Sequence, residues 1–228
     1  MPAITLQNAV VRYGDHRALG PVTLTLEPDE CVVLVGESGA GKSTLLGLLR
    51  AQVRKQAAWL PQELGLVPTL SVFHNVYMGR LHRFGTLSNV LNLVRPRPEA
   101  VAEIRPLLAR LGLEPMIWKP AGELSGGQKQ RVAVARALYQ QADWILADEP
   151  VSALDREWAN QVMQQLTQVH AGAVIALHNI DLALRYGQRI IGLKDGLIIL
   201  DAPAQSLSRD DLMALYPDRS GSVPAHAG

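Results

Sequence analysis

The stretch GESGAGKST, residues 36–44, has the residue types and the spacing needed to hold phosphate groups. It fits the pattern G-x-x-x-x-G-K-[ST], follows the apolar run CVVLV and opens a helical run. Glycines let backbone N–H groups approach phosphate oxygens, Lys42 can reach the β- and γ-phosphates, and the Ser43 hydroxyl can ligate Mg²⁺. The glycine order differs from G-x-G-x-x-G, which disfavours a dehydrogenase. The candidate phosphate-binding residues are Gly36, Glu37, Ser38, Gly39, Ala40, Gly41, Lys42, Ser43 and Thr44.

A second glycine-rich stretch, LSGGQ at residues 124–128, precedes the helical run QKQRVAVARAL. The Ser125 side chain and the N–H groups of Gly126 and Gly127 would form another anion-binding helix start. Two such starts cannot easily face one triphosphate within a compact monomer. The first motif alone does not explain why one chain carries both loops.

Two adjacent carboxylates, Asp148 and Glu149, end the apolar run WILADE. The carboxyl ends of parallel strands border the ligand crevice of an open sheet, so we expect both carboxylates at the phosphate site. There Asp148 can support the Mg²⁺ shell, and Glu149 can orient or deprotonate an attacking water. His178 ends another apolar run, although a lone histidine is more often structural than catalytic. Gln62 and Tyr13 are weak candidates on their own.

The elements expected around these residues are those of an α/β protein. Residues 3–13 and 22–30 alternate as strands do, on either side of a turn near YGDH. Apolar runs predict further, buried strands at CVVLVG and at residues 57–62, 143–150, 173–178 and 189–196. Between the second and third of these runs the spacing becomes helical. A mostly helical insertion therefore divides a strand-rich core.

Composition excludes several classes of protein. The chain has 228 residues and a formal charge of +1, from 22 Lys and Arg against 21 Asp and Glu, so nucleic acid is not an expected partner. The single Cys31 cannot form an internal disulfide and fits a buried strand in a reducing compartment. No apolar run reaches the roughly 18 residues of a spanning helix, and the start does not look like a secretory signal. We expect a cytoplasmic protein that meets a membrane only through a partner.

Read in order, the motifs resemble the ATP-binding cassette (ABC) family. The motifs are VRYGD, GESGAGKST, LPQE, LSGGQKQRVAVARAL, ILADEP, SALD and ALH, and the resemblance runs from Tyr13 to about Tyr216. It implies that Tyr13 stacks on adenine and that Gln62 senses Mg²⁺ and the attacking water. It also implies that Asp155 belongs to a loop at a dimer interface and that His178 holds the γ-phosphate and water.

The resemblance also accounts for the second glycine loop. In this family LSGGQ caps the ATP bound to a second subunit, so Ser125, Gly126, Gly127 and Gln128 would face the phosphate loop of a partner copy. A head-to-tail homodimer would then enclose two ATP molecules with Mg²⁺. The implied fold is a P-loop NTPase core, a parallel sheet with flanking helices plus N-terminal antiparallel strands, and an inserted α-helical subdomain. The expected domain boundaries are 1–70 and 140–216 for the core, 71–139 for the helical subdomain and 217–228 for a loose tail.

Within the family the chain is similar to ATP-binding subunits of phosphonate importers. The stretch SVFHNVYMGRLHRFGTL and the stretch LHNIDLALRYGQRIIGLKDGLIILD, with a later LY, carry this likeness. It implies permease subunits as partners, an indirect link to a periplasmic or surface solute-binding protein, and a place on the inner face of the cell membrane. Two alternatives stay open: a soluble subunit of a phosphonate-degrading enzyme complex, and an exporter or cell-division-type ABC partner.

Two further features of the sequence are a short interval between Lys42 and Gln62 and a basic stretch at residues 64–98. Lys42 and Gln62 are only 20 residues apart (62 − 42), which suggests that a peripheral antiparallel segment is missing while the central strand ending at Gln62 survives. Residues 64–98 contain no acidic residue but contain Arg80, His82, Arg83, Arg95 and Arg97. This basic stretch is either a solvated face or a surface that meets a permease loop or anionic headgroups, with Arg80 and Arg83 as the test positions.

Overall fold

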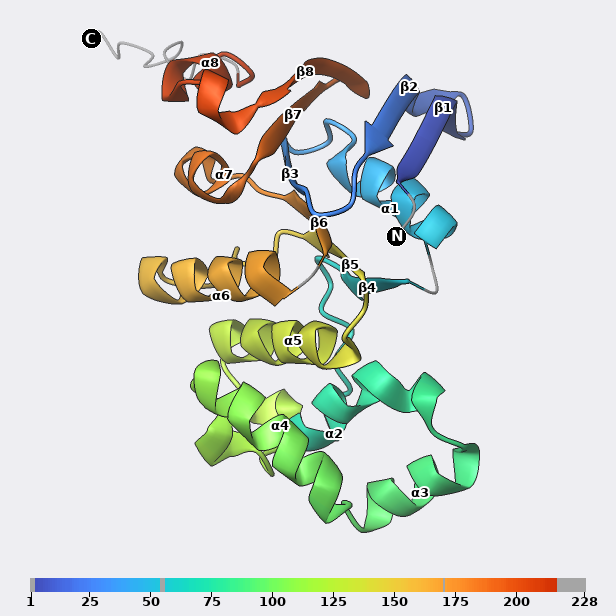
Figure 1. Ribbon diagram of the computed structural model, residues 1–228, viewed down its shortest axis with the longest axis vertical. Coiled ribbons are helices and arrows are strands. Elements are labelled where there is room, and N and C mark those ends of the chain that lie inside the picture. Colours follow the sequence, from blue (N-terminus) through green and yellow to red (C-terminus); the bar gives the residue numbers. More distant parts are fainter. Residues whose placement is uncertain (1–2, 54–55, 170, 217–228) are drawn as a thin grey trace, which may run out of the picture.

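The computed structural model describes residues 3–53, 56–169 and 171–216, and it contains two sheets (Figure 1). The predicted tail, residues 217–228, lies outside the described residues. A two-stranded antiparallel sheet pairs β1 (Ile4–Tyr13) with β2 (His16–Leu26) across a two-residue turn in which Gly14 has a φ of +58°. The second sheet has the order β4-β5-β6-β3-β7-β8, in which only β8 is antiparallel to its neighbour. Its strands are β3 (Cys31–Val35), β4 (Ala57–Leu60), β5 (Trp144–Asp148), β6 (Gly172–Ala176), β7 (Arg189–Lys194) and β8 (Leu197–Pro203).

Helices cover both faces of the six-stranded sheet, and the strand residues alternate between two cores. Along β3, Val33 and Val35 face one core while Val32 and Leu34 face the other. The hairpin and α1 pack on the second face, whereas α5, α6 and α7 pack on the first. The α-helices are α1 (Lys42–Val53), α2 (Val72–Tyr77), α3 (Thr86–Val94), α4 (Pro98–Arg110), α5 (Gly126–Gln140), α6 (Arg156–Val169), α7 (Ile180–Tyr186) and α8 (Arg209–Met213).

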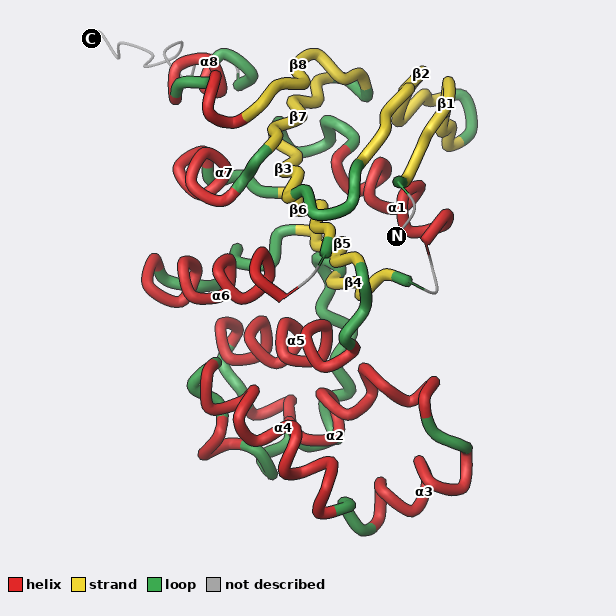
Figure 2. Tube along the Cα trace, in the orientation of Figure 1, coloured by secondary structure: helices red, strands yellow, loops and turns green. Residues whose placement is uncertain are grey.

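The helices α2 to α5 gather at one end of the molecule, beyond the edge of the sheet (Figure 2). Short 3₁₀ turns η1 (Met78–Arg83), η2 (Glu114–Met116) and η3 (Ala121–Glu123) connect them, and η4 (Ala204–Ser206) precedes α8. Within the described residues, no helix is long and apolar enough to cross a bilayer. The expectation that residues 71–139 behave as a separate subdomain stays a prediction.

The strand before Gln62 survives the short interval, but the prediction that it is a central strand is wrong. β4 lies at the edge of the sheet, where β5 is its one partner among the described strands, and it ends at Leu60. The edge position follows from the chain path, because α1 crosses the sheet face and leads almost directly into β4. The side chain of Gln140 reaches this edge and donates from Nε2 to the Ala57 carbonyl at 3.2 Å.

Candidate active site

The phosphate loop connects β3 to α1 and depends on backbone conformations that favour glycine. Gly36, Gly39 and Gly41 have φ values of +142°, +83° and +104°. A Cβ atom on Gly36 would lie 2.2 Å from the Leu193 carbonyl oxygen, and one on Gly41 would lie 3.1 Å from the Ala18 carbonyl oxygen. The loop is therefore packed against β7 and the hairpin, with its N–H groups at the start of α1.

Lys42 folds back over the loop that precedes it. Its Nζ atom donates to the carbonyl oxygens of Gly36 at 2.7 Å and Glu37 at 2.8 Å, and the side chain is 5% exposed. Burial lowers the pKa of Lys42, while the nearby Glu149 and Asp148 carboxylates act in the opposite direction. An anion that binds in the loop can replace these two carbonyl oxygens as the hydrogen-bond partner of the Lys42 ammonium group.

Asp148 ends β5 and is 4% exposed, and none of the described residues provides a hydrogen-bond partner for its Oδ1 atom. A buried carboxylate oxygen without a partner is costly unless a cation or a donor approaches it. Ser43 follows Lys42 at the exposed start of α1, so it presents a hydroxyl oxygen at the same loop. Mg²⁺ prefers such oxygen ligands, and the donor set therefore fits that ion.

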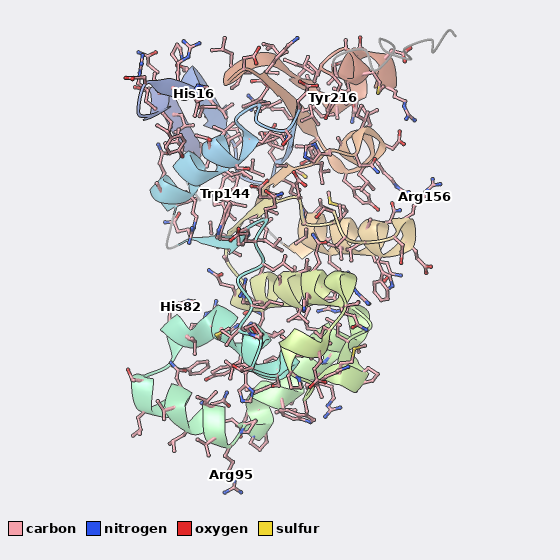
Figure 3. The ribbon with its side chains drawn as sticks, turned by 180° about the vertical axis from the view of Figure 1, so that it is seen from behind. His16, His82, Arg95, Trp144, Arg156 and Tyr216 are labelled. Carbon is pink, nitrogen blue, oxygen red and sulfur yellow. The ribbon has the colours of Figure 1, made fainter. Side chains whose placement is uncertain are left out.

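Glu149 and His178 meet beyond the ends of β5 and β6. The His178 Nε2 atom lies 2.5 Å from Glu149 Oε1, and the two side chains are 43% and 16% exposed, respectively. Glu149 leaves its strand with a φ of +53°, and its N–H donates to the Ala176 carbonyl at 3.1 Å. A cavity of about 710 Å³ opens beside this pair, between α6 and α7, and is also lined by Arg156, which Figure 3 labels. Solvent can therefore reach the carboxylate.

Gln62 and Tyr13 are both exposed, and among the described residues no hydrogen bond joins either side chain to the phosphate loop. Gln62 is exposed two residues after β4. Leu60 pairs with Ala147 in the parallel β4–β5 pair, so Gln62 and Asp148 lie at the same end of the sheet. Within the described residues, no hydrogen bond links Gln62 to Ser43 or Asp148. Tyr13 is 66% exposed on the hairpin, which gives its ring room to stack. Both assignments remain predictions.

The loop that follows Gln62 is fastened to α5 by Arg136. The Arg136 guanidinium donates to the Gly65 carbonyl at 2.7 Å and the Leu64 carbonyl at 2.5 Å. Burial lowers the pKa of Arg136. Hydrogen bonds therefore join the loop after Gln62 to α5, the helix that LSGGQ precedes.

The structure does not bring the second glycine loop to the first. Ser125 and Gln128 form a capping box at the start of α5, with Ser125 N–H donating to Gln128 Oε1 at 2.9 Å and Gln128 N–H donating to Ser125 Oγ at 3.3 Å. Gly126 is exposed in the first turn of that helix. Because α5 and α1 pack on opposite faces of the sheet (Figure 1), their N-termini do not converge within one chain.

Asp155 has a local structural role in addition to the predicted one. Its Oδ1 atom accepts from the Trp158 N–H at 2.9 Å, so it caps the start of α6. The carboxylate is in an exposed residue, and its place at a dimer interface remains a prediction.

Two residues of this region were missed by sequence reasoning. Gln130, only 3% exposed on α5, donates to the Glu149 carbonyl at 2.7 Å and accepts from the Ala153 N–H at 2.7 Å. Tyr216 accepts from the Gly36 N–H at 3.3 Å, and burial raises the pKa of its hydroxyl. The signal for Gln130 was a polar residue at the start of the apolar run RVAVARAL, whereas the distance of Tyr216 from the loop in sequence gave none.

Comparisons with known proteins identify the relatives of this chain. The family model of the ABC transporter matches residues 19–152. The phosphonates import ATP-binding protein PhnC of Pseudomonas putida is 37% identical, with 99% of this chain and 94% of that protein covered. The protein of the same description from Frankia casuarinae is also 37% identical, with 100% of both chains covered. The dimeric structure of a post-hydrolysis state of the ATP-binding cassette MJ0796, bound to ADP and Pi, has a TM-score of 0.73 and 29% identity, and it covers 88% of this chain and 98% of that one.

Proposed function

The chain belongs to the ABC transporter family, and from that premise we propose that it hydrolyses ATP to drive an importer of phosphonate-like solutes. The observation that carries the proposal is the match, over nearly the whole chain, to phosphonates import ATP-binding proteins. The fold and the ATP-driven role in a transporter are properties of the family. The identity of the solute is the further part of the proposal. The intact phosphate loop and the Glu149–His178 contact support retained catalysis.

ATP binds with its triphosphate over residues 36–44, where Lys42 exchanges loop carbonyls for β- and γ-phosphate oxygens. Mg²⁺, held by Ser43, Gln62 and Asp148, would supply positive charge against the developing charge of the phosphates. Glu149 orients a water and accepts its proton as the water oxygen attacks the γ-phosphorus, and the bond to the β-phosphate oxygen breaks. His178 holds the Glu149 carboxylate through Nε2, which fixes the direction of proton transfer.

A second copy of the chain completes each site. α1 and α5 lie on opposite faces of the sheet, and among the described residues no hydrogen bond joins residues 125–128 to the phosphate loop of their own chain. A head-to-tail pair places them on the partner's ATP, with Asp155 at the contact and each Tyr13 on its own adenine. ATP binding closes the pair and hydrolysis opens it.

The partners in this proposal are integral membrane permease subunits and, through them, a solute-binding protein outside the membrane. The chain then sits at the cytoplasmic face of the membrane. The helical region, residues 71–139, is the part that we propose transmits closure to the permease. The names of the relatives support an importer.

A tagged pull-down from solubilised membranes and, in parallel, from the soluble fraction tests the import role. Mass spectrometry should identify a polytopic permease and a solute-binding protein with this chain. Copurification with soluble phosphonate-degrading enzyme subunits and no permease would replace the import role with assembly of an enzyme complex. An export permease without a binding protein would reverse the direction of transport.

A further inference from the structure

The helix α3 is amphipathic, but its polar side faces the protein. Asn89 donates from Nδ2 to the Leu81 and Phe84 carbonyls at 3.0 and 3.2 Å. Asn92 is fully buried and accepts from the Arg97 N–H at 2.8 Å. Residues three apart lie on one side of a helix, so these two asparagines fix its rotation.

The opposite side of α3 is apolar and exposed. Leu87, Leu91 and Val94 are 74%, 59% and 83% exposed, and their spacing of four and three residues places them on one ridge. Val90 and Leu93 are about half exposed beside them, at 53% and 49%. Figures 1 and 2 show α3 projecting at the helical end of the molecule. A contiguous apolar surface of this kind marks a site of interaction.

Basic residues follow the ridge directly in the sequence. Arg95 follows α3 directly and extends away from the molecule, whereas His82 is exposed on the same helical part of the molecule but nearer the sheet (Figure 3). Residues 64–98 contain no Asp or Glu, and the exposed Glu99 that follows them pairs with Arg97 at 3.6 Å. The earlier expectation that Arg80 belongs to this surface is wrong, because its guanidinium is buried, pairs with Glu103 at 2.8 Å and donates to the Tyr139 carbonyl.

We propose that the α3 ridge docks on a bilayer surface that contains anionic lipid. The aliphatic side chains lie at the boundary between the headgroups and the acyl chains, and Arg95 lies on the phosphates. The ridge is a row of Leu and Val side chains, and a fluid apolar layer covers such a row without a matching shape. Apolar burial and attraction of basic residues to anionic headgroups add in this mode of binding. The contact goes beyond the proposed function, because it needs neither a permease nor ATP.

Vesicle flotation of the purified full-length chain tests the proposal. The chain should float with phosphatidylglycerol-containing vesicles and not with pure phosphatidylcholine vesicles. Leu91→Gln with Val94→Gln should lower the bound fraction about tenfold, since both apolar side chains leave the interface. The matched control is Ile199→Gln on β8, which is 51% exposed and should bind as the parent chain does.

Charge reversal at Arg95 provides a second test of vesicle binding. Arg95→Glu should lower binding about tenfold or more, because each basic residue near an anionic surface contributes to affinity. Arg17→Glu on the hairpin, at the other end of the molecule, is the control and should have little effect. ATP hydrolysis in solution should be unchanged in all four variants, which shows that the chain is folded and keeps this test separate from the proposed function.

Three results would overturn the inference. They are no flotation with anionic vesicles, flotation that the α3 and Arg95 variants do not change, and binding only to vesicles that carry permease subunits. The last result would assign the ridge to a protein partner.

Discussion

Glu149 occupies a backbone conformation that few residues other than glycine adopt. Glu149 is the first residue after the extended strand β5, and its φ is +53°. Two contacts hold it there, the N–H bond to the Ala176 carbonyl and the bond that its own carbonyl accepts from Gln130. A strained residue that neighbours fix from both sides is typical of a functional position.

Glu149→Gln should slow ATP hydrolysis by about 10²- to 10⁴-fold, the range for loss of a general base, while ATP binding is kept. The amide has nearly the same shape but cannot accept the proton of the attacking water. Steady-state phosphate release and equilibrium nucleotide binding measure the two effects. Glu157→Gln, on the exposed first turn of α6, is the control. A turnover rate equal to that of the parent chain would remove Glu149 from its role.

Gln130→Ala should lower kcat about tenfold and leave the affinity for ATP nearly unchanged. The substitution frees the Glu149 carbonyl and the Ala153 N–H, and buried polar groups that lose a partner cost roughly 1–3 kcal/mol. The loss falls on positioning, because Gln130 does not touch the phosphate loop.

The control for Gln130 is Lys129→Ala, on the adjacent position of the same helix. Nucleotide affinity and kcat should both stay near the parent values in that variant. A Gln130→Ala chain with weakened ATP binding and unchanged kcat would contradict the positioning role.

Sequence reasoning found the residues whose motif is local. The glycines of residues 36–44 and the carboxylates at the end of β5 stand where their patterns predicted, because strand, loop and helix are contiguous there. Gln130 and Tyr216 were missed because their partners are 19 and 180 residues away in the chain. Such contacts depend on tertiary packing, which a local pattern does not encode.

At the scale of elements, β3 provides a pH-sensitive probe of the core. Burial, with a further contribution from Glu30, raises the pKa of the Cys31 thiol from 9.0 to about 12. Between these two values the native thiol keeps its proton while the unfolded thiol loses it, so the free energy of unfolding should fall as pH rises.

Thiol labelling measures this effect. Because burial raises the pKa of the Cys31 thiol, the native chain holds far less thiolate than the unfolded chain at pH 8, and labelling should be much slower in the native chain than in denaturant. A Cys31→Ala chain should lose this contribution to the pH dependence of unfolding. Rapid labelling of the native chain would show that β3 is accessible.

Besides the edge position of β4, two elements were not anticipated from the sequence, β8 and α3. The strand predicted at residues 189–196 corresponds to β7, and β8 was not predicted, although the Asp195–Gly196 turn, with φ values of +49° and +75°, is of the kind that joins antiparallel strands. The rotation of α3 could not be predicted, because an amphipathic pattern normally places its apolar side inward. Side-chain hydrogen bonds of Asn89 and Asn92 decide the opposite orientation.

At the scale of the whole molecule, the opposed positions of α1 and α5 predict an ATP-dependent dimer. Glu149→Gln chains that bind but do not hydrolyse ATP should double in molar mass by light scattering when ATP is added. Adding Gly126→Asp should keep the chain monomeric, because a carboxylate would repel the partner's triphosphate.

Gly126 can be replaced by a residue with a side chain without a clash. The nearest atom to a Cβ at Gly126 is the Ala153 Cβ, at 4.0 Å. Gly47→Asp, where a Cβ would meet nothing within 4 Å, is the control and should still dimerise. Dimerisation of the Gly126→Asp chain would exclude the head-to-tail arrangement.

The edge strand β4 also bears on how the chain avoids aggregation. The Gln56 carbonyl accepts from Trp144 N–H, toward β5, and carbonyls alternate along a strand, so the Ala57 carbonyl points to the free edge. Free edges invite strand pairing between chains and fibre growth. Here β4 has only four residues, and the Gln140 side chain occupies the Ala57 carbonyl. The shortened interval therefore leaves an edge that offers little template to a second strand.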